Sequence, residues 1–543
     1  MANIGRLSAD VLSDIFIQVA IDGYHDVPQS QGFTVPVPAM PRTSSRVYKY
    51  IAFSHVCREW RRIALGTPTL WARMVFPCKP PSEELFARSG RAPLWVKTVL
   101  EADNNTGVQF SLIKANAPRL RQLHLIGPAL AIVDYLLTWT SQADELEDLA
   151  LLAEDTYGTV RERSPHPQIP SQPPKSLRRL AIRNFALNWA SPLLSPTLTT
   201  LATSTYGTLA PSAGSMIELL NALRNMSALE FLELSETIPH IPQSAAAAPQ
   251  DNPAVNLPRL RTCVLKGRVK ELAYLLRHLS IPPETRLVLA AHDRGEDVQQ
   301  LMGAVHEVFA RNSWDPIVGL LLPADSMGRM CIMGWRSLVE SDPKLPCDLQ
   351  ISLDSSKCFA AIRDIMDGPV FAQCQRAKAE RMHADCWEKF LHHLPELREL
   401  TMRDTEYMDL PVLSGKPREV NLPVPKLTVL KLSCFRFGCI HDEHRKTGYE
   451  QLVSILRWRR KHDVPITRLE LLKCTNADEA AVDSLRMFVT TVVWDENEDF
   501  DHEASNPEHL CPDRFPLLCT YDHEDMAYDF GLDMFDGVSD EDA

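Results

Sequence analysis

Leu120-Arg121-Gln122-Leu123-His124-Leu125 is the stretch that decides the fold, because its pattern Leu-x-x-Leu-x-Leu recurs along the chain. Comparable stretches start at the following positions: Leu146, Leu177, Leu198, Leu229, Leu260, Ile317, Leu397, Leu427 and Ile466. Apolar residues two apart predict a strand with one buried face. The starts from Leu120 to Leu260 lie 26, 31, 21, 31 and 31 residues apart, near the length of one strand and one helix. Units of this kind cover their apolar faces by stacking on their neighbours.

The segments between these strands carry helical periodicity. We expect helices at 216–224, 269–279 and 298–310, and a longer one at 371–394, with weaker strands at 286–289 and 349–353. The expected fold is therefore α/β, a curved array of short parallel strands with helices, that is, an irregular solenoid. Leu-x-x-Leu-x-Leu also occurs in ordinary α/β domains, so that alternative stays open, although ten recurrences argue against chance.

Composition narrows the class of protein. The chain has 543 residues, of which 45% are hydrophobic and 23% charged, as in globular proteins. No apolar run approaches the roughly 18 residues that a membrane span needs, so we expect no membrane association. Thirteen cysteines are scattered without a framework, which favours reduced thiols and a cytoplasmic or nuclear location.

The net charge of −13 is unevenly distributed along the chain. Residues 495–543 hold seventeen acidic residues and one arginine, Arg514, so this acidic tail carries −16. The remaining 56 basic and 53 acidic residues give a nearly neutral body of +3. Such a body lacks the basic footprint of a nucleic-acid binder, and we expect no nucleic-acid partner. The tail is predicted to be disordered.

The first 76 residues differ from the repeats. Apolar periodicity predicts a helix at 7–20, a second at 53–65 and a third that opens at Thr67-Pro68. The proline-rich segment 22–46 interrupts them as a loop or insertion. A bundle this small cannot bury its apolar faces and two tryptophans alone, so it must pack on the next domain, a partner or both. A simple helical cap on a larger core is the other interpretation.

Three stretches in this region resemble an F-box. They are Leu7-Ser8-x-x-Val11-Leu12-x-x-Ile15-Phe16, the run Ser54 to Ala64 with Val56-Cys57-Arg58-x-Trp60-Arg61, and Thr67-Pro68-Thr69-Leu70-Trp71. The chain is most similar to the F-box-like proteins expanded in mushroom-forming fungi, and the strands behind it resemble degenerate leucine-rich repeats. It departs from the family in having Leu-Ser where Leu-Pro is usual, and in the 22–46 insertion.

The resemblance implies a substrate-recognition subunit of a cullin-based (SCF-type) ubiquitin ligase. The head would bind a Skp-type adaptor and thereby the cullin scaffold, and the repeats would bind an unknown protein target. Leu70 and Trp71 would brace the head on the repeats. The expected adaptor-binding residues are Leu7, Val11, Leu12, Ile15, Phe16, Val56, Cys57 and Trp60. The alternative is a leucine-rich-repeat scaffold for protein interaction with no ligase role.

The sequence signals no catalytic chemistry. It contains no phosphate-binding loop, nucleophile elbow or His-Glu-x-x-His pair, so we expect a non-catalytic subunit without a cofactor. Cys434, Cys439, His441 and His444 are a weak zinc candidate, since the ligand types fit but the spacing is short of a zinc finger. The expected domains are an F-box-like head (1–76, insertion 22–46), a repeat array (77–494) and the acidic tail (495–543).

Overall fold

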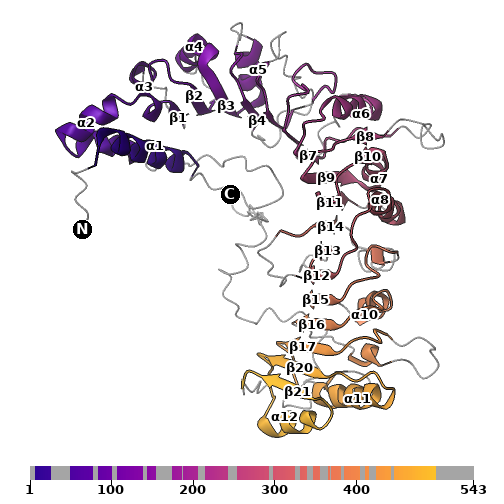
Figure 1. The fold of residues 1–543 in the computed structure, drawn as a ribbon. Helices are drawn as coiled ribbons and strands as arrows, with labels where there is room; N and C mark the ends of the chain where they lie inside the picture. Colours follow the sequence, from indigo (N-terminus) through magenta and orange to yellow (C-terminus); the bar gives the residue numbers. More distant parts are fainter. Residues whose placement is uncertain are drawn as a thin grey trace, which may run out of the picture. The chain divides into compact units, whose positions relative to one another are not determined.

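The computed structural model is a mixed α/β fold with a large, mostly parallel sheet, as the repeats predict. The structure describes residues 7–25, 49–76, 83–100, 107–137, 143–153, 174–185, 187–205, 214–241, 254–292, 298–323, 330–338, 346–354, 365–366, 368–380, 384–403, 410–414, 423–438, 440–441 and 446–496. They form two compact units (Figure 1): unit 1 comprises the described residues to 241 and Val255–Leu260, and unit 2 comprises Ala254 and the described residues from Arg261. This division falls within the segment predicted as one repeat array.

Unit 1 opens with short helices and continues as a parallel sheet. Its helical elements are α1 (Ala9–His25), η2 (Lys49–His55), α2 (Arg58–Leu65), η3 (Pro68–Leu70), α3 (Glu83–Arg88), α4 (Gly107–Ala115), η5 (Ala117–Arg119), α5 (Ala129–Leu137) and α6 (Met216–Asn225). Its strands are β1 (Arg73–Phe76), β2 (Leu94–Val99), β3 (Leu120–Gly127), β4 (Asp148–Ala153), β5 (Arg179–Arg183), β6 (Thr200–Ser204), β7 (Phe231–Ser235) and β8 (Val255–Asn256). From β1 to β7 each strand pairs in parallel with the next strand of the chain.

Unit 2 also consists of helices and a mostly parallel sheet, and the parallel order of its strands is interrupted once. Its helical elements are α7 (Val269–His278), α8 (Val298–Arg311), α10 (Ala384–Leu391), η6 (Leu410–Leu413), α11 (Gly448–Lys461) and α12 (Glu479–Arg486). Its strands are β9 (Thr262–Arg268), β10 (Leu279–Ser280), β11 (Arg286–His292), β12 (Gly319–Pro323), β13 (Met330–Trp335), β14 (Leu349–Asp354), β15 (Arg376–Glu380), β16 (Glu399–Arg403), β17 (Val429–Ser433), β18 (Ile440–His441), β19 (Lys446–Thr447), β20 (Arg468–Leu472) and β21 (Thr491–Trp494).

Each quoted repeat forms a strand, and the same turn precedes many of them. In most repeats the strand begins two residues after the first leucine, as β5 does after Leu177. The N–H of that leucine donates to the carbonyl three residues earlier, and its side chain is buried. This turn occurs at Leu146, Leu177, Leu198, Leu229, Leu260, Leu397 and Leu427. The first leucine therefore anchors the turn, and the next two apolar residues supply the strand's buried face.

The interruption in unit 2 places β14, not β12, beside β11. β11 pairs in parallel with β14, and β13 is antiparallel to both β14 and β12. β12 then pairs in parallel with β15, after which β16, β17, β20 and β21 follow in chain order. A hairpin-like excursion thus reverses the order of β12 and β14 and inserts one antiparallel strand into the parallel sheet.

Two of the helix predictions are wrong. The segment 371–394 contains β15 and, after it, only the short helix α10. The third head helix is a single 3-10 turn, η3, followed by β1, which pairs with β2 through Met74 and Val96. Apolar residues in a short run fit either period, and pairing with a neighbouring strand decides between them. The second head helix is split into η2 and α2.

Candidate functional site

Helix α1 presents two adjacent rows of apolar residues, one buried in the core and the other exposed to solvent. The inner row, Leu12, Phe16 and Ala20, is buried. The outer row, with the same four-residue spacing, is solvent-exposed: Val11, Ile15 and Val19 of α1 and Leu7 just before the helix are 44, 42, 37 and 37% exposed. Residues four apart lie one above the other on a helix. The apolar periodicity that predicted this helix therefore resolves into one row for the core and one row for the surface.

The inner row packs on the second helical segment. The Phe16 ring stacks on Phe53 with centroids 4.4 Å apart and tilts against Trp60 at 5.1 Å. Ile63 and Ala64 of α2 complete this core. Burying an aromatic residue in such a cluster stabilises it by about 1.5–3 kcal/mol. The inner row thus fixes α1 in place and leaves the outer row facing solvent.

Trp71 joins the head to the sheet of unit 1. It is 1% exposed, and its Nε1 donates to the carbonyl oxygen of Ala64 at 2.7 Å. On its other side, the Arg88 guanidinium of α3 stacks over the indole at 4.6 Å. Leu70 is fully buried beside it. Because β1 follows directly, these two side chains hold the helical segment against the first strand.

The turn before α2 exposes two more residues of the predicted set. Cys57 has extended backbone angles and caps α2, its Sγ accepting from the N–H of Trp60 at 3.4 Å. Cys57 is exposed and Val56 is 58% exposed. Leu65, at the end of α2, is also exposed at 41%.

The eight predicted contact residues therefore separate into three groups. Leu12 and Phe16 lie in the core and cannot touch a partner, and Trp60 is half-buried against Phe16. Five lie on the surface: Leu7, Val11, Ile15, Val56 and Cys57. The prediction missed Val19 and Leu65 as surface residues. The four-residue spacing from Leu7 could have identified Val19. α1 extends to His25, into the predicted insertion, whose residues 26–46 lie outside the described part.

The surface row provides apolar contact area rather than reactive groups. Its neighbours on the same elements are charged and exposed: Asp10, Asp14, Arg58, Glu59, Arg61 and Arg62. An apolar row within a charged rim is the composition of a protein-binding patch.

The zinc candidate is only partly described. Cys439 and His444 lie outside the described residues, and Cys434 lies just after β17. Among the described residues, no group of three or more His, Cys, Asp or Glu side chains could hold a metal ion.

A buried polar cluster crosses strands β2 to β5. Asp148 accepts from Gln122 at 2.7 Å and from Arg179 at 3.0 Å, and lies 3.2 Å from His124 Nε2. Burial alone would raise the pKa of Asp148, but the contacts with His124 and Arg179 outweigh burial and lower that pKa. Lys97, beside His124 in the register, has its pKa lowered to about 8 by burial, against the opposing charge of Asp148. The cluster links neighbouring strands.

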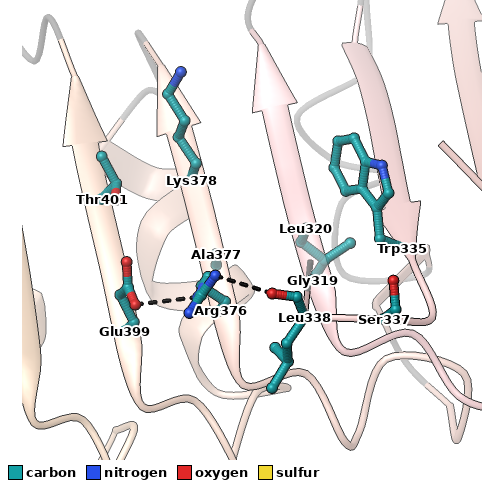
Figure 2. Close-up of a pocket in the computed structure, with 10 residues that line it drawn as sticks. All are labelled: Gly319, Leu320, Trp335, Ser337, Leu338, Arg376, Ala377, Lys378, Glu399 and Thr401. Atoms are coloured by element: carbon teal, nitrogen blue, oxygen red, sulfur yellow. Dashed lines mark hydrogen bonds and ion pairs between the residues drawn. The ribbon is translucent and has the colours of Figure 1, made fainter. Parts of the chain in front are cut away.

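A shallow pocket lies on the sheet of unit 2, between β12 and β13 on one side and β15 and β16 on the other. Figure 2 shows Arg376 at its centre, joined to the Glu399 carboxylate and to the carbonyl oxygen of Leu338. Trp335 and the 43% exposed Leu338 supply its apolar wall. A pocket of about 40 Å³ admits only the tip of a side chain.

In the described part of the chain, no helix has the length and apolar character required to cross a bilayer. No protein-family model matches the chain, and no curated protein matches it in sequence.

Proposed function

We propose that this chain is the substrate-recognition subunit of an SCF-type ubiquitin ligase, with the N-terminal head binding a Skp-type adaptor. The observation that carries the proposal is the exposed row Val11, Ile15 and Val19 of α1, continued by Leu7 just before the helix, while the other row of α1 is buried in the core. Together with Val56 and Cys57, this row is the adaptor-binding surface. The F-box-like order of the head residues supplies the identity of the partner.

The remaining chain suits the role of a target-binding platform. Strands of β1 to β7 follow one another in parallel register, as stacked repeats do, and we propose that they form a leucine-rich-repeat solenoid. Trp71 and Arg88 connect the head to that array. Rigid attachment matters because a receptor works by holding a target lysine near the ubiquitin carrier, which raises its effective concentration. Catalysis belongs to the partner subunits.

The test compares wild type with the double variant Val11→Asp, Ile15→Asp in a pull-down with a purified Skp-type adaptor. Both positions are exposed, so the variant keeps the core of the head. Two side chains each contributing about 1.5–3 kcal/mol at an interface predict a loss of roughly 100-fold or more in affinity. Leu12→Asp or Phe16→Asp would be a poor test, because both side chains are buried and their replacement would unfold the head.

Leu130→Asp on α5 is the matched control, since Leu130 is 63% exposed and lies outside the head. The control should bind the adaptor as wild type does. If the wild-type chain does not bind the adaptor, the ligase role is refuted and the repeat scaffold becomes the better description. Equal binding by wild type and the double variant would show that the outer row is not the contact surface.

A further inference from the structure

The sheet of unit 2 has one face turned away from its helices. In Figure 1, α7, α8, α10 and α11 lie along one side of its strands. Alternate strand residues such as Leu265, Leu400 and Leu430 are fully buried on that side. The intervening residues of β9, β11, β12 to β17 and β20 point the other way, and we call this surface the open face.

Basic residues are concentrated on the open face. They are Lys266, Arg268, Arg286, Arg376, Lys378, Arg403, Lys431 and Arg468. The acidic residues with described side chains in the same register positions are Glu380, Glu399 and Glu470. These eleven residues give the open face a charge of +5, whereas residues 1–496 as a whole hold 56 basic and 55 acidic residues. The other residues of 1–496 therefore sum to −4, and this face is distinctly cationic.

Each acidic residue in the ion pairs of this face contacts two basic residues. Glu399 contacts Arg376 at 3.1 Å and Lys431 at 2.8 Å. The remaining shared pairs are Lys378 and Arg403 with Glu380, and Lys431 and Arg468 with Glu470. Each carboxylate serves two cations, so five cations share three carboxylates. Their side chains stay between 28 and 49% exposed and can meet further anions.

The pocket of Figure 2 lies within this cationic surface. Arg376 and Lys378 line it together with the carboxylate of Glu399, so an incoming carboxylate would meet a net charge of +1. Trp335, which is 7% exposed, supplies an apolar wall.

The chain itself contains a segment with the complementary chemistry. Residues 497–543 hold fifteen acidic residues and one arginine, Arg514. Aromatic residues are interspersed among them: Phe500, Phe515, Tyr521, Tyr528, Phe530 and Phe535. The segment leaves the described structure directly after β21, the strand that pairs with β20 of the open face. We propose that this acidic C-terminal segment binds the open face of unit 2 in the same molecule.

Reach and local concentration favour this intramolecular contact. Forty-seven residues span up to about 155 Å when extended. The ten strands from β21 to β9 cover only about 45 Å at the usual spacing. A tethered partner has an effective concentration in the millimolar range, so weak ion pairs suffice for substantial occupancy. The tail would then compete with any external acidic partner of this face, whether or not the head binds an adaptor.

Carbodiimide cross-linking of the full-length chain tests the proposal, because this reagent joins a carboxylate directly to a lysine amine with loss of water. Mass spectrometry should find tail carboxylates joined to Lys266, Lys378 and Lys431 of the open face. The control lysines are Lys270 on α7, Lys389 on α10 and Lys461 on α11, which are all more exposed. Cross-linking governed by exposure alone would favour these control lysines. The open-face cross-links should be lost at about 0.5 M NaCl, where exposed charges are screened.

Equal or preferred cross-linking of the tail to the helix lysines would overturn the proposal. Mixing isotope-labelled and unlabelled chains identifies the molecule that donates the tail. Mixed-label cross-links in place of single-label ones would show that a second copy occupies the face, which also overturns the intramolecular contact. A charge-reversed chain, Lys378→Glu with Lys431→Glu, should lose the tail cross-links to Lys266, whereas Lys389→Glu with Lys461→Glu should keep them.

Discussion

Arg459 shows how one side chain of α11 organises a whole segment. It is fully buried, and its guanidinium donates to the carbonyl oxygens of Leu413, Val424, Leu427 and Val464. Burial lowers the pKa of Arg459 to about 10, which leaves it charged at neutral pH. The last turn of this helix is basic in sequence, with Arg459, Arg460 and Lys461, which suits the negative end of a helix dipole. It could not indicate that one of these arginines points into the core.

Arg459→Met should destabilise unit 2, because several buried carbonyl groups lose a charged donor. We expect the free energy of unfolding to fall by about 3 kcal/mol or more, since each bond to a charged group contributes about 1.5–3 kcal/mol. Urea unfolding followed by circular dichroism measures this change. Arg460→Met is the matched control, because the adjacent Arg460 is exposed and should matter little. A similar loss in both variants would contradict this role.

Lys97 makes the free energy of unfolding depend on pH. Its pKa is about 8 in the folded chain, because burial penalises the charged amine, and 10.5 when unfolded. Below pH 8 both states hold the proton, so the folded state carries the full penalty. Between pH 8 and 10.5 the folded state releases its proton first, and stability rises.

Lys97→Met should therefore be more stable than wild type at pH 7, by about 1–3 kcal/mol. The difference should shrink as the pH approaches 10, because wild-type Lys97 is then neutral in the folded state. Urea unfolding of both chains at pH 7 and pH 10 measures it, and the subtraction cancels other titrating groups. A constant difference at both pH values would show that Lys97 is not the titrating group.

At the scale of elements, α1 separates core from surface by a rotation of one residue. Leu12 and Phe16 face Trp60 and α2, while Val11 and Ile15 face solvent. The sequence located the apolar residues correctly but could not divide them, because their positions form one continuous arc around the helix and periodicity does not mark where the core ends. Only the packing of Phe16 against Phe53 and Trp60 decides the rotation.

Substitutions in the two rows should therefore lower the stability of the head by different amounts. Phe16→Ala should lower the stability of the head by about 3–5 kcal/mol, the usual cost of truncating a buried aromatic residue. Ile15→Ala should change it by less than about 0.5–1 kcal/mol, because an exposed side chain leaves no cavity. Thermal unfolding of the two variants makes the comparison. Equal destabilisation would show that both rows are buried in solution.

The strands also show which elements the sequence pattern predicts and which it misses. β3 to β7 follow the leucine pattern closely, and the leucines of that pattern are buried, as Leu123, Leu180 and Leu232 are. β1, β13 and β15 lie outside the quoted repeats, and the sequence pattern did not identify them. Their runs are short, and hydrogen bonds from neighbouring strands rather than their own periodicity make them strands.

At the scale of the whole molecule, the strands of the unit 2 sheet become less buried toward its last strand, β21. β16 lies between β15 and β17, and alternate residues are buried, including Leu400. β21 pairs with β20, and none of its residues is fully buried. Exposed apolar residues lie nearby: Leu472, Met487 and Val493.

Hydrogen exchange should follow this difference. Peptides covering Thr491–Trp494 should exchange much faster than peptides covering Glu399–Arg403, because local opening of a poorly covered strand costs little. Exchange of the full-length chain, measured by mass spectrometry at constant pH and temperature, compares the two directly. Equal protection of β21 and β16 would show that β21 is covered in solution.

The sequence alone determined where most strands lie and that the fold is α/β, because a repeated leucine spacing permits few other burial patterns. It also placed the apolar surface residues Val11 and Ile15 within the candidate site. Tertiary structure alone decided which row of α1 faces outward and that β14 lies beside β11. It also decided that basic residues gather on one face of unit 2. These outcomes depend on contacts between residues far apart in the chain, which local spacing does not encode.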